Sequence, residues 1–320
     1  MTNNQPLPAA HQAALDSFER KLQLLRDHVM AVIKEFKTGL FLYGPGGAGK
    51  SYTVLDLLKR QEASYKLFNS RMTAKGLFLA LEQAPDAIHV LEDMERLTRD
   101  PDAQGVLRSA LWAQPGHDRK ITWTTAKGAP HVIFRGGIIM ISNRPLADLP
   151  ELRALATRIE VHRLEATEAE LTAFMRHLAS QGYKQSDKLA LDPEQCHEVT
   201  EHLLSECRKA GCPLDLRLQQ KSFLTYLQWQ GEYSATDWHD LLAASVREAT
   251  CHFRYASNPL SAEARKIHKR NVLREIMSQT DDPKEQERLY KERTGRERAD
   301  CYRRKAEIKS GEFDEQDAAA

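Results

Sequence analysis

Cysteine is scarce in this sequence, and none of it is spaced for a metal site or a redox motif. The 320 residues include five cysteines, without a C-x-x-C pair: Cys196, Cys207, Cys212, Cys251 and Cys301. An odd number of cysteines, placed on segments with helical periodicity, favours reduced thiols over a disulfide framework. We therefore expect a cytoplasmic protein that does not bind metal through cysteine.

Long apolar runs and an excess of charge of one sign are also missing. No stretch approaches the ~20 apolar residues of a membrane span. The N-terminal MTNNQPLPAAHQ lacks the basic-then-apolar pattern of a signal sequence. Lys and Arg total 46 against 45 Asp and Glu, which gives a formal net charge of +1. We expect no membrane partner, and the overall charge indicates no class of ligand.

Charge is nevertheless distributed unevenly along the chain. Residues 263–309 contain fifteen Lys and Arg against ten Asp and Glu, a net charge of +5. Residues 312–317 are acidic again, and we expect 310–320 to form a disordered tail. The segment before this tail is therefore the region whose charge favours an acidic partner.

Glycine is concentrated in one short stretch, FLYGPGGAGKSYTV at 41–54. An apolar strand runs into a loop that matches G-x-x-x-x-G-K-[ST], and its small residues let main-chain N–H groups close around phosphate oxygens. Lys50 can reach the β- and γ-phosphates, and the Ser51 hydroxyl can ligate Mg²⁺. A glycine-rich turn alone would not need this Lys-Ser pair, so we expect a nucleoside triphosphate with Mg²⁺. The expected nucleotide-binding residues are Gly44, Pro45, Gly46, Gly47, Ala48, Gly49, Lys50, Ser51 and Tyr52.

Apolar runs that alternate with helical periodicity predict an α/β fold. The expected strands are Leu40–Tyr43, Tyr65–Asn69, Ala87–Leu91, Gly137–Ser142 and Arg158–Leu164. Helices are expected at 14–36, 73–83 and 103–113. Strands that alternate with helices after a phosphate loop indicate a mostly parallel sheet.

The character of the sequence changes after Leu164, where strand-like runs disappear. Helical patterns at 168–181, 193–210, 215–229 and 235–250 predict an all-α module, and Asn-Pro in RYASNPLSAE at 254–263 indicates a linker. The expected divisions are an N-terminal helical segment at 1–37, an α/β core at 38–164, a helical module at 165–256 and a small all-α basic domain at 259–309.

Two further apolar strands end in polar side chains. AIHVLEDMERL at 87–97 ends in Glu92, expected to hold Mg²⁺, and Asp93, expected to orient and polarise the attacking water. GGIIMISNRP at 136–145 ends in Asn143, whose amide could hold that water against the γ-phosphate. Solvated acids and a turn-favouring Asn are the plainer alternatives, but beside a phosphate loop the pattern favours hydrolysis.

The order of these elements resembles the AAA+ ATPases over about residues 20–255. Lys50 and Ser51 match the family's Walker A positions, and Asn143 matches sensor 1. Glu92 and Asp93 match Walker B in swapped order, and the shorter Asp93 would lie further from the water. The resemblance implies an ATP-hydrolysing enzyme with a parallel-sheet core and a C-terminal helical lid, working as a ring or spiral homo-oligomer.

Two more positions follow from the resemblance. ELRALATRIEV at 151–161 looks like the segment that delivers an arginine finger to a neighbouring subunit, with Arg158 or Arg153 as the finger. A surface arginine paired with acids is the plainer interpretation. PLDLRLQQKSFLTYL at 213–227 resembles the sensor 2 helix, on which Arg217 would reach the γ-phosphate.

A hairpin is expected before the sensor 1 strand. Ile121–Thr125 and His131–Phe134 alternate on either side of AKGAP, with Lys127 near the tip and Arg119 near the base. In AAA+ rings that act on DNA such a hairpin often projects into the pore, which would place Lys127 near phosphate. An ordinary surface hairpin is the alternative.

The segment 282–308 divides at Thr294-Gly295 into two helices and resembles a helix-turn-helix unit. The second helix would lie in the major groove, and the residues expected to face DNA are Arg296, Arg298, Arg303 and Arg304. Helices of mixed charge are also found as solvated faces, and apolar residues are few here.

Together these features favour ATP-driven handling of DNA, as in replication initiation, helicase loading or transposition, with a helicase, initiator or transposase as partner. Two alternatives stay open. One is a protein remodeller, although NSRMTAKGLFL at 69–79 lacks the aromatic-apolar-Gly pattern of a pore loop. The other is a slowly hydrolysing, nucleotide-gated DNA-binding scaffold, which the Glu-Asp order would suit.

Overall fold

The computed structural model describes residues 9–94, 97, 100–112, 117–124, 126, 128–145, 157–186, 189–257, 262–280, 282–294 and 298–310. The chain divides into two compact units, Met1–Arg247 and Glu248–Ala320, and each is described by itself. None of the helices in the described ranges is both long enough and apolar enough to cross a membrane.

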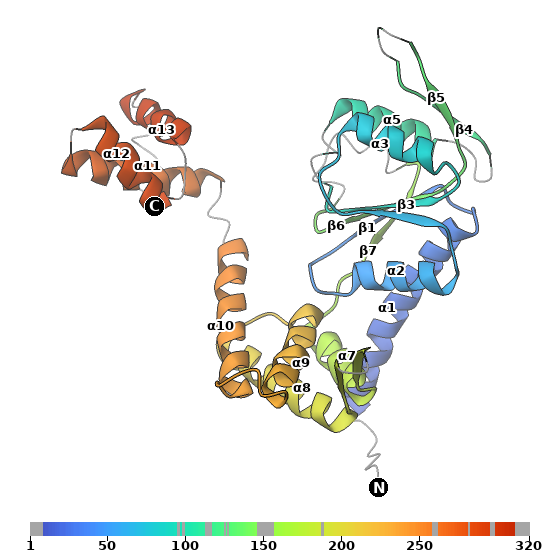
Figure 1. Ribbon diagram of the computed structural model, residues 1–320, viewed down its shortest axis with the longest axis horizontal. Helices are drawn as coiled ribbons and strands as arrows, with labels where there is room; N and C mark the ends of the chain where they lie inside the picture. The colour runs from blue at the N-terminus through green and yellow to red at the C-terminus, as the bar shows by residue number, and fades with distance from the viewer. Residues whose placement is uncertain are drawn as a thin grey trace. The chain divides into compact units, whose positions relative to one another are not determined.

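A five-stranded parallel sheet forms the centre of the first unit (Figure 1). Its strands are β1 (Gly39–Tyr43), β2 (Tyr65–Phe68), β3 (Ile88–Glu92), β6 (Ile138–Ser142) and β7 (Glu160–Arg163). They are hydrogen-bonded in the order β2-β3-β6-β1-β7. All five strands expected from the sequence are present, each within two residues of its expected bounds, and the α/β fold with a parallel sheet is confirmed.

Helices cover both faces of this sheet. The helices that surround it are α1 (Ala9–Ile33), α2 (Lys50–Arg60), α3 (Ala74–Gln83) and α5 (Pro101–Leu111). In Figure 1, α1 and α2 lie on one face and α3 and α5 on the other. Leu40 and Leu42 pack toward α1 and α2, while Phe41 packs toward α3 and α5. The central strands β1, β3 and β6 are therefore buried on both faces and read as nearly continuous apolar runs, whereas the edge strands β2 and β7 keep exposed residues.

The expected hairpin is present as β4 (Arg119–Thr122) and β5 (His131–Phe134), an antiparallel pair outside the main sheet. Its inward residues Ile121 and Phe134 are fully buried. The ring of Trp123 lies 6.0 Å from that of Phe78 on α3, so the hairpin packs against that helix. Lys127 lies outside the described residues.

The segment after β7 is not all-α, and that expectation was wrong. Its helices are α7 (Glu168–Ser180), α8 (Pro193–Ala210), α9 (Leu216–Gln230) and α10 (Trp238–Ser257). Between α7 and α8 the chain forms a short antiparallel hairpin, β8 (Tyr183–Ser186) and β9 (Leu189–Leu191). Most of its residues are exposed, so the hairpin leaves no alternating apolar pattern in the sequence.

Three further helices lie in the second unit: α11 (Ala262–Gln279), α12 (Pro283–Thr294) and α13 (Arg298–Ser310). They share a small core of Leu273, Ile276, Tyr290 and Cys301. The expected division at Thr294-Gly295 agrees with the end of α12. Few apolar residues hold this group together, as the sequence indicates.

Candidate functional site

The site lies where three neighbouring strands end. The phosphate loop follows β1, Glu92 is the last residue of β3, and Asn143 follows β6. Strand β6 pairs in parallel with both β1 and β3, so Asn143 emerges between the loop and the acidic pair. Residues far apart in the sequence thus meet at the carboxyl ends of the strands.

Glycine is required at specific points of the loop. Gly47 and Gly49 have φ of 76° and 84°, in the left-handed region that disfavours side chains. A Cβ on Gly44 would lie 2.0 Å from the carbonyl oxygen of Leu164, where the chain leaves β7. Gly49 is also the N-cap of α2 and supplies no side-chain acceptor to the first-turn N–H groups. Those donors favour an anionic ligand.

Lys50 is the buried cation of the site, and the residue is only 6% exposed. Its Nζ donates to Gly44 O at 2.8 Å, to Pro45 O at 2.7 Å and to Asn143 Oδ1 at 3.1 Å. Burial and then the charge of Arg217 lower the pKa of Lys50, although nearby carboxylates oppose this. An anionic ligand would restore the stability of the charged form.

Ser51 and Glu92 are in direct contact, because the Ser51 hydroxyl donates to Glu92 Oε1. A hydroxyl and a carboxylate oxygen at this spacing fit Mg²⁺, a cation that prefers oxygen and takes few protein ligands beside nucleotide phosphates. These two residues are the ones that would hold the ion, as the sequence predicts.

Asp93 and Asn143 are also brought together. Asn143 Nδ2 donates to Asp93 Oδ1 at 3.3 Å, which extends the contact from Lys50 through Asn143 to Asp93. Asp93 has a left-handed backbone with φ of 53°, and its N–H donates to Ile141 O at 3.0 Å. Asp tolerates this conformation better than a longer side chain, which gives the Glu-Asp order a structural reason.

A cavity of about 570 Å³ opens from the phosphate loop between the sheet edge and the helices that follow β7. Arg217 and Tyr52 line it, and Arg217 Nη1 lies 4.0 Å from the position of a Cβ on Gly46. The sequence did not identify the rest of its wall, in which polar residues such as Arg26, Lys184 and Gln220 accompany apolar ones. The apolar part comes from α1, α7, β8 and α9: Leu22, Phe174, Leu178, Tyr183 and Phe223. Helical periodicity marks such residues only as core.

Asp215 is a further residue that the sequence did not identify. It caps α9, and its carboxylate lies so close to Gly47 that a Cβ there would be 2.2 Å from Asp215 Cγ. The N–H of Leu216 donates to Gly47 O at 3.1 Å. The first turn of α9 therefore rests on the phosphate loop.

The expected arginine finger is not part of this chain's own site. Arg158 comes just before β7, whose first residue, Glu160, lies beside Leu40 at the start of β1. The phosphate loop follows the carboxyl end of β1, so Arg158 lies at the opposite side of the sheet, at the amino-terminal ends of the strands. Arg153 lies outside the described residues.

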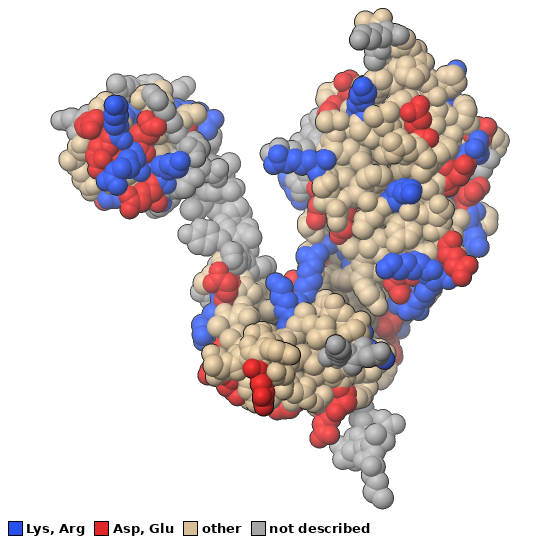
Figure 2. Space-filling model, in the orientation of Figure 1, with Lys and Arg blue, Asp and Glu red and all other residues tan. Residues whose placement is uncertain are grey.

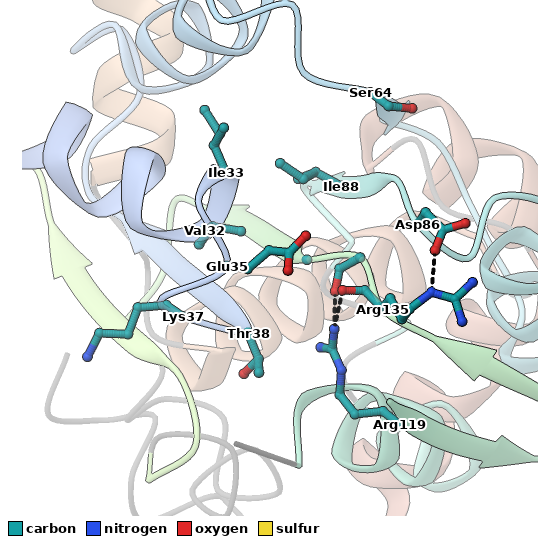
Figure 3. A pocket seen from close by; sticks show the side chains of 12 residues that line it. Val32, Ile33, Glu35, Lys37, Thr38, Ser64, Asp86, Ile88, Arg119 and Arg135 are labelled. Atoms are coloured by element: carbon teal, nitrogen blue, oxygen red, sulfur yellow. Dashed lines mark hydrogen bonds and ion pairs between the residues drawn. The ribbon is translucent and has the colours of Figure 1, made fainter. Parts of the chain in front are cut away.

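A smaller cavity of about 90 Å³ lies at the amino-terminal ends of the strands (Figure 3). Arg119 is buried there, donating from Nη1 to Ala110 O at 2.7 Å and from Nη2 to the carbonyls of Arg135, at 2.6 Å, and Gly136. Burial lowers the pKa of Arg119 to about 10. Its guanidinium anchors the base of the β4–β5 hairpin and is not exposed for phosphate contact.

One of the expected DNA-facing arginines is in the wrong place for that role. Arg304 is 5% exposed and donates to Glu307 Oε1 at 2.6 Å, so it lies inside the helical group. Arg303 is exposed but pairs with Asp300 at 2.5 Å. Figure 2 shows basic and acidic side chains interleaved over these helices. Arg296 and the side chain of Arg298 lie outside the described part.

The chain matches no known protein-family model, and it has no significant match among curated proteins.

Proposed function

We propose that this protein is a Mg²⁺-dependent ATPase of the AAA+ type. The observation that carries the proposal is the continuous set of contacts from Lys50 through Asn143 to Asp93, beside the Ser51–Glu92 pair. Lys50 and the loop N–H groups bind the phosphates, while Ser51 and Glu92 hold Mg²⁺. Asp93 orients the attacking water with the help of Asn143.

Isothermal titration with ATP and Mg²⁺, combined with phosphate release, tests these roles. Lys50→Ala removes the charge that the loop cannot otherwise supply, so we expect it to abolish ATP binding. Asp93→Asn keeps the hydrogen bonding but removes the base, so binding is retained and hydrolysis is lost. If Asp93→Asn hydrolysed ATP normally while Glu92→Gln bound ATP without cleaving it, the two acidic roles would be reversed.

The same proposal includes a homo-oligomer, a ring or spiral in which Arg158 completes the site of the neighbouring subunit. Arg158 lies at the amino-terminal ends of the strands, opposite the phosphate loop, and this position supports a role across a contact between subunits. Arg158→Ala protein mixed with Asp93→Asn protein should regain part of its activity, because some interfaces then combine an intact site with an intact finger. Mixtures that stay inactive at every ratio would exclude Arg158 as a finger acting in trans.

We further propose that ATP turnover drives work on DNA, with a helicase, initiator or transposase as partner. The anchored β4–β5 hairpin before the Asn143 strand and the basic 263–309 segment support this role. The paired arginines of α13 support only weak duplex binding. Measuring the ATPase rate with and without single- and double-stranded DNA tests it, because a rate unchanged by either would favour a protein substrate.

A slowly hydrolysing, nucleotide-gated scaffold is the second candidate. The geometry of Asp93 favours this scaffold. Its backbone is left-handed and its carboxylate accepts from Asn143 Nδ2 at 3.3 Å, so the short side chain has little freedom to move toward the attacking water. A DNA affinity that changes severalfold with ATP while turnover stays below about one per minute would support the scaffold over the motor, because kcat of ordinary enzymes is far higher.

A further inference from the structure

Gln219 is a buried polar side chain in the wall of the large cavity, apart from the residues that would bind phosphate. It belongs to α9 and is 2% exposed. Its Nε2 donates to Met175 O on α7 at 2.8 Å and to Thr200 Oγ1 on α8 at 2.9 Å. An amide nitrogen carries two hydrogens, so these two bonds use all of its capacity to donate.

The orientation of this amide is fixed by its partners. A carbonyl oxygen can only accept, so the atom that faces Met175 O is the nitrogen, and Oε1 points elsewhere. Within the described part of the chain no donor bonds to Gln219 Oε1, and this oxygen is not fully enclosed by protein atoms. The side chain therefore presents to the cavity an acceptor that has no partner among the described residues, and no donor.

The surroundings of Gln219 fit a flat ring attached to a bound phosphate. Phe174 and Phe223 line the same cavity, and Phe223 is one helical turn beyond Gln219 on α9. The Leu216 N–H donates to Gly47 O at 3.1 Å, so the first turn of α9 rests on the phosphate loop. At a rise of about 1.5 Å per residue, Gln219 is only about 5 Å further along the helix. A nucleotide whose phosphates occupy the loop can extend its base to this wall.

We propose that Gln219 selects the base of the nucleotide by accepting a hydrogen bond from its exocyclic amino group. The inference rests on the proposed ATPase function and adds the residue that recognises adenine. The amino group at position 6 of adenine donates to Oε1. Guanine in the same orientation presents O6, a second acceptor, and the amide nitrogen cannot turn toward it without breaking its bonds to Met175 and Thr200. The site therefore prefers adenine nucleotides to guanine nucleotides.

Isothermal titration of the full-length protein with Mg²⁺ and three nucleotides tests the proposal: ATP, GTP and purine riboside triphosphate, which is ATP without the 6-amino group. We expect the purine analogue to bind about tenfold more weakly than ATP, because the buried Oε1 then has no donor, and GTP to bind more weakly still. Equal affinity for ATP and the analogue, or tighter binding of GTP than of ATP, would overturn base selection by Gln219. Binding of the three with equal affinity would leave the phosphate site intact, whereas binding of none would overturn both proposals.

Gln219→Met separates base selection from a merely structural role, because it keeps the length of the side chain and removes the amide. We expect the preference for ATP over the purine analogue to fall from about tenfold to less than about twofold. Ser222→Ala is the matched control, since Ser222 is also buried on α9, donates to Leu218 O at 2.8 Å and does not line the cavity. It should leave the preference unchanged, and thermal melts show whether both variants fold. A preference for ATP that survives in folded Gln219→Met protein would overturn the proposal.

Discussion

At the residue scale, the candidate site is held together by polar contacts from Lys50 to Asn143 and from Asn143 to Asp93. A glycine-rich loop and polar residues at strand ends predict four residues that the structure brings together: Lys50, Ser51, Glu92 and Asn143. The sequence did not predict Asp215 as a neighbour of the phosphate loop, because an Asp before a helix looks like any other N-cap. Its contact with Gly47 depends on how α9 packs against a loop distant in the sequence. The sequence predicted that Arg304 would face DNA, but the residue is buried. A charged residue among few apolar ones gives no sign of burial.

The left-handed backbone at Asp93 leads to the first prediction. Asp93→Glu would put a longer carboxylate at this position, nearer the expected water, yet we expect turnover to fall by about tenfold. Glu in this conformation costs about 1 kcal/mol more than Asp, and a catalytic carboxylate displaced by ~1 Å loses much of its effect. Phosphate release and a thermal melt check it. Faster turnover than the unsubstituted protein at the same Tm would contradict the backbone argument.

Glu170 provides a prediction about pH. Burial alone would raise its pKa, but hydrogen bonds from Lys21 Nζ and Ser17 Oγ, each 2.7 Å long, and from Thr167 N–H at 2.8 Å outweigh burial and hold the pKa at about 2. The folded pKa lies below that of the unfolded chain. The ionised group therefore stabilises the fold at neutral pH, and this contribution is lost as pH falls from about 4.5 toward 2.

Glu170→Gln keeps the capping box of α7 but removes the charge. We expect it to lower the free energy of unfolding at pH 7 by about 2–3 kcal/mol, and the difference from the unsubstituted protein should shrink toward pH 3. Urea denaturation at several pH values measures both. A difference that stays constant with pH would show that the ionised carboxylate is not the source.

At the element scale, strands buried on both faces were the most predictable part of the fold. The central strands β1, β3 and β6 read as apolar runs that end at a turn or polar residue, whereas the edge strands β2 and β7 are more polar. The order of the strands in the sheet follows from packing between distant segments. The β8–β9 hairpin was missed because its residues are short of apolar alternation and mostly exposed. Exposed short strands are held by their neighbours and leave little trace in the sequence.

The anchor of the β4–β5 hairpin leads to a prediction about an element. Arg119→Met leaves the carbonyls of Ala110, Arg135 and Gly136 without their donor, and we expect a loss of about 2–3 kcal/mol of stability. Lys120→Met, at the exposed neighbouring position, is the control and should change stability by less than about 0.5 kcal/mol. Chemical denaturation measures both. Equal stability of the two variants would contradict the anchoring role.

At the scale of the whole molecule, the second unit is expected to contribute DNA binding and not catalysis. A chain ending after Ser257 should still hydrolyse ATP and should lose most of its affinity for duplex DNA. Binding by the full chain should weaken steeply with salt, because each phosphate contact releases condensed counterions. Arg303→Ala should reduce this affinity, whereas Arg304→Ala should destabilise the helical group. Unchanged duplex affinity in the shortened chain would exclude α11–α13 as the DNA contact.

The central claim is that one site of this chain binds ATP and cleaves it with Asp93. The most direct measurement identifies the nucleotide held by purified full-length protein after incubation with ATP and Mg²⁺, acid quenching and chromatography. We predict ADP from the unsubstituted protein, intact ATP from Asp93→Asn, and no bound nucleotide from Lys50→Ala. Intact ATP from the unsubstituted protein at long times, or ADP in equal amount from Asp93→Asn, would contradict the account.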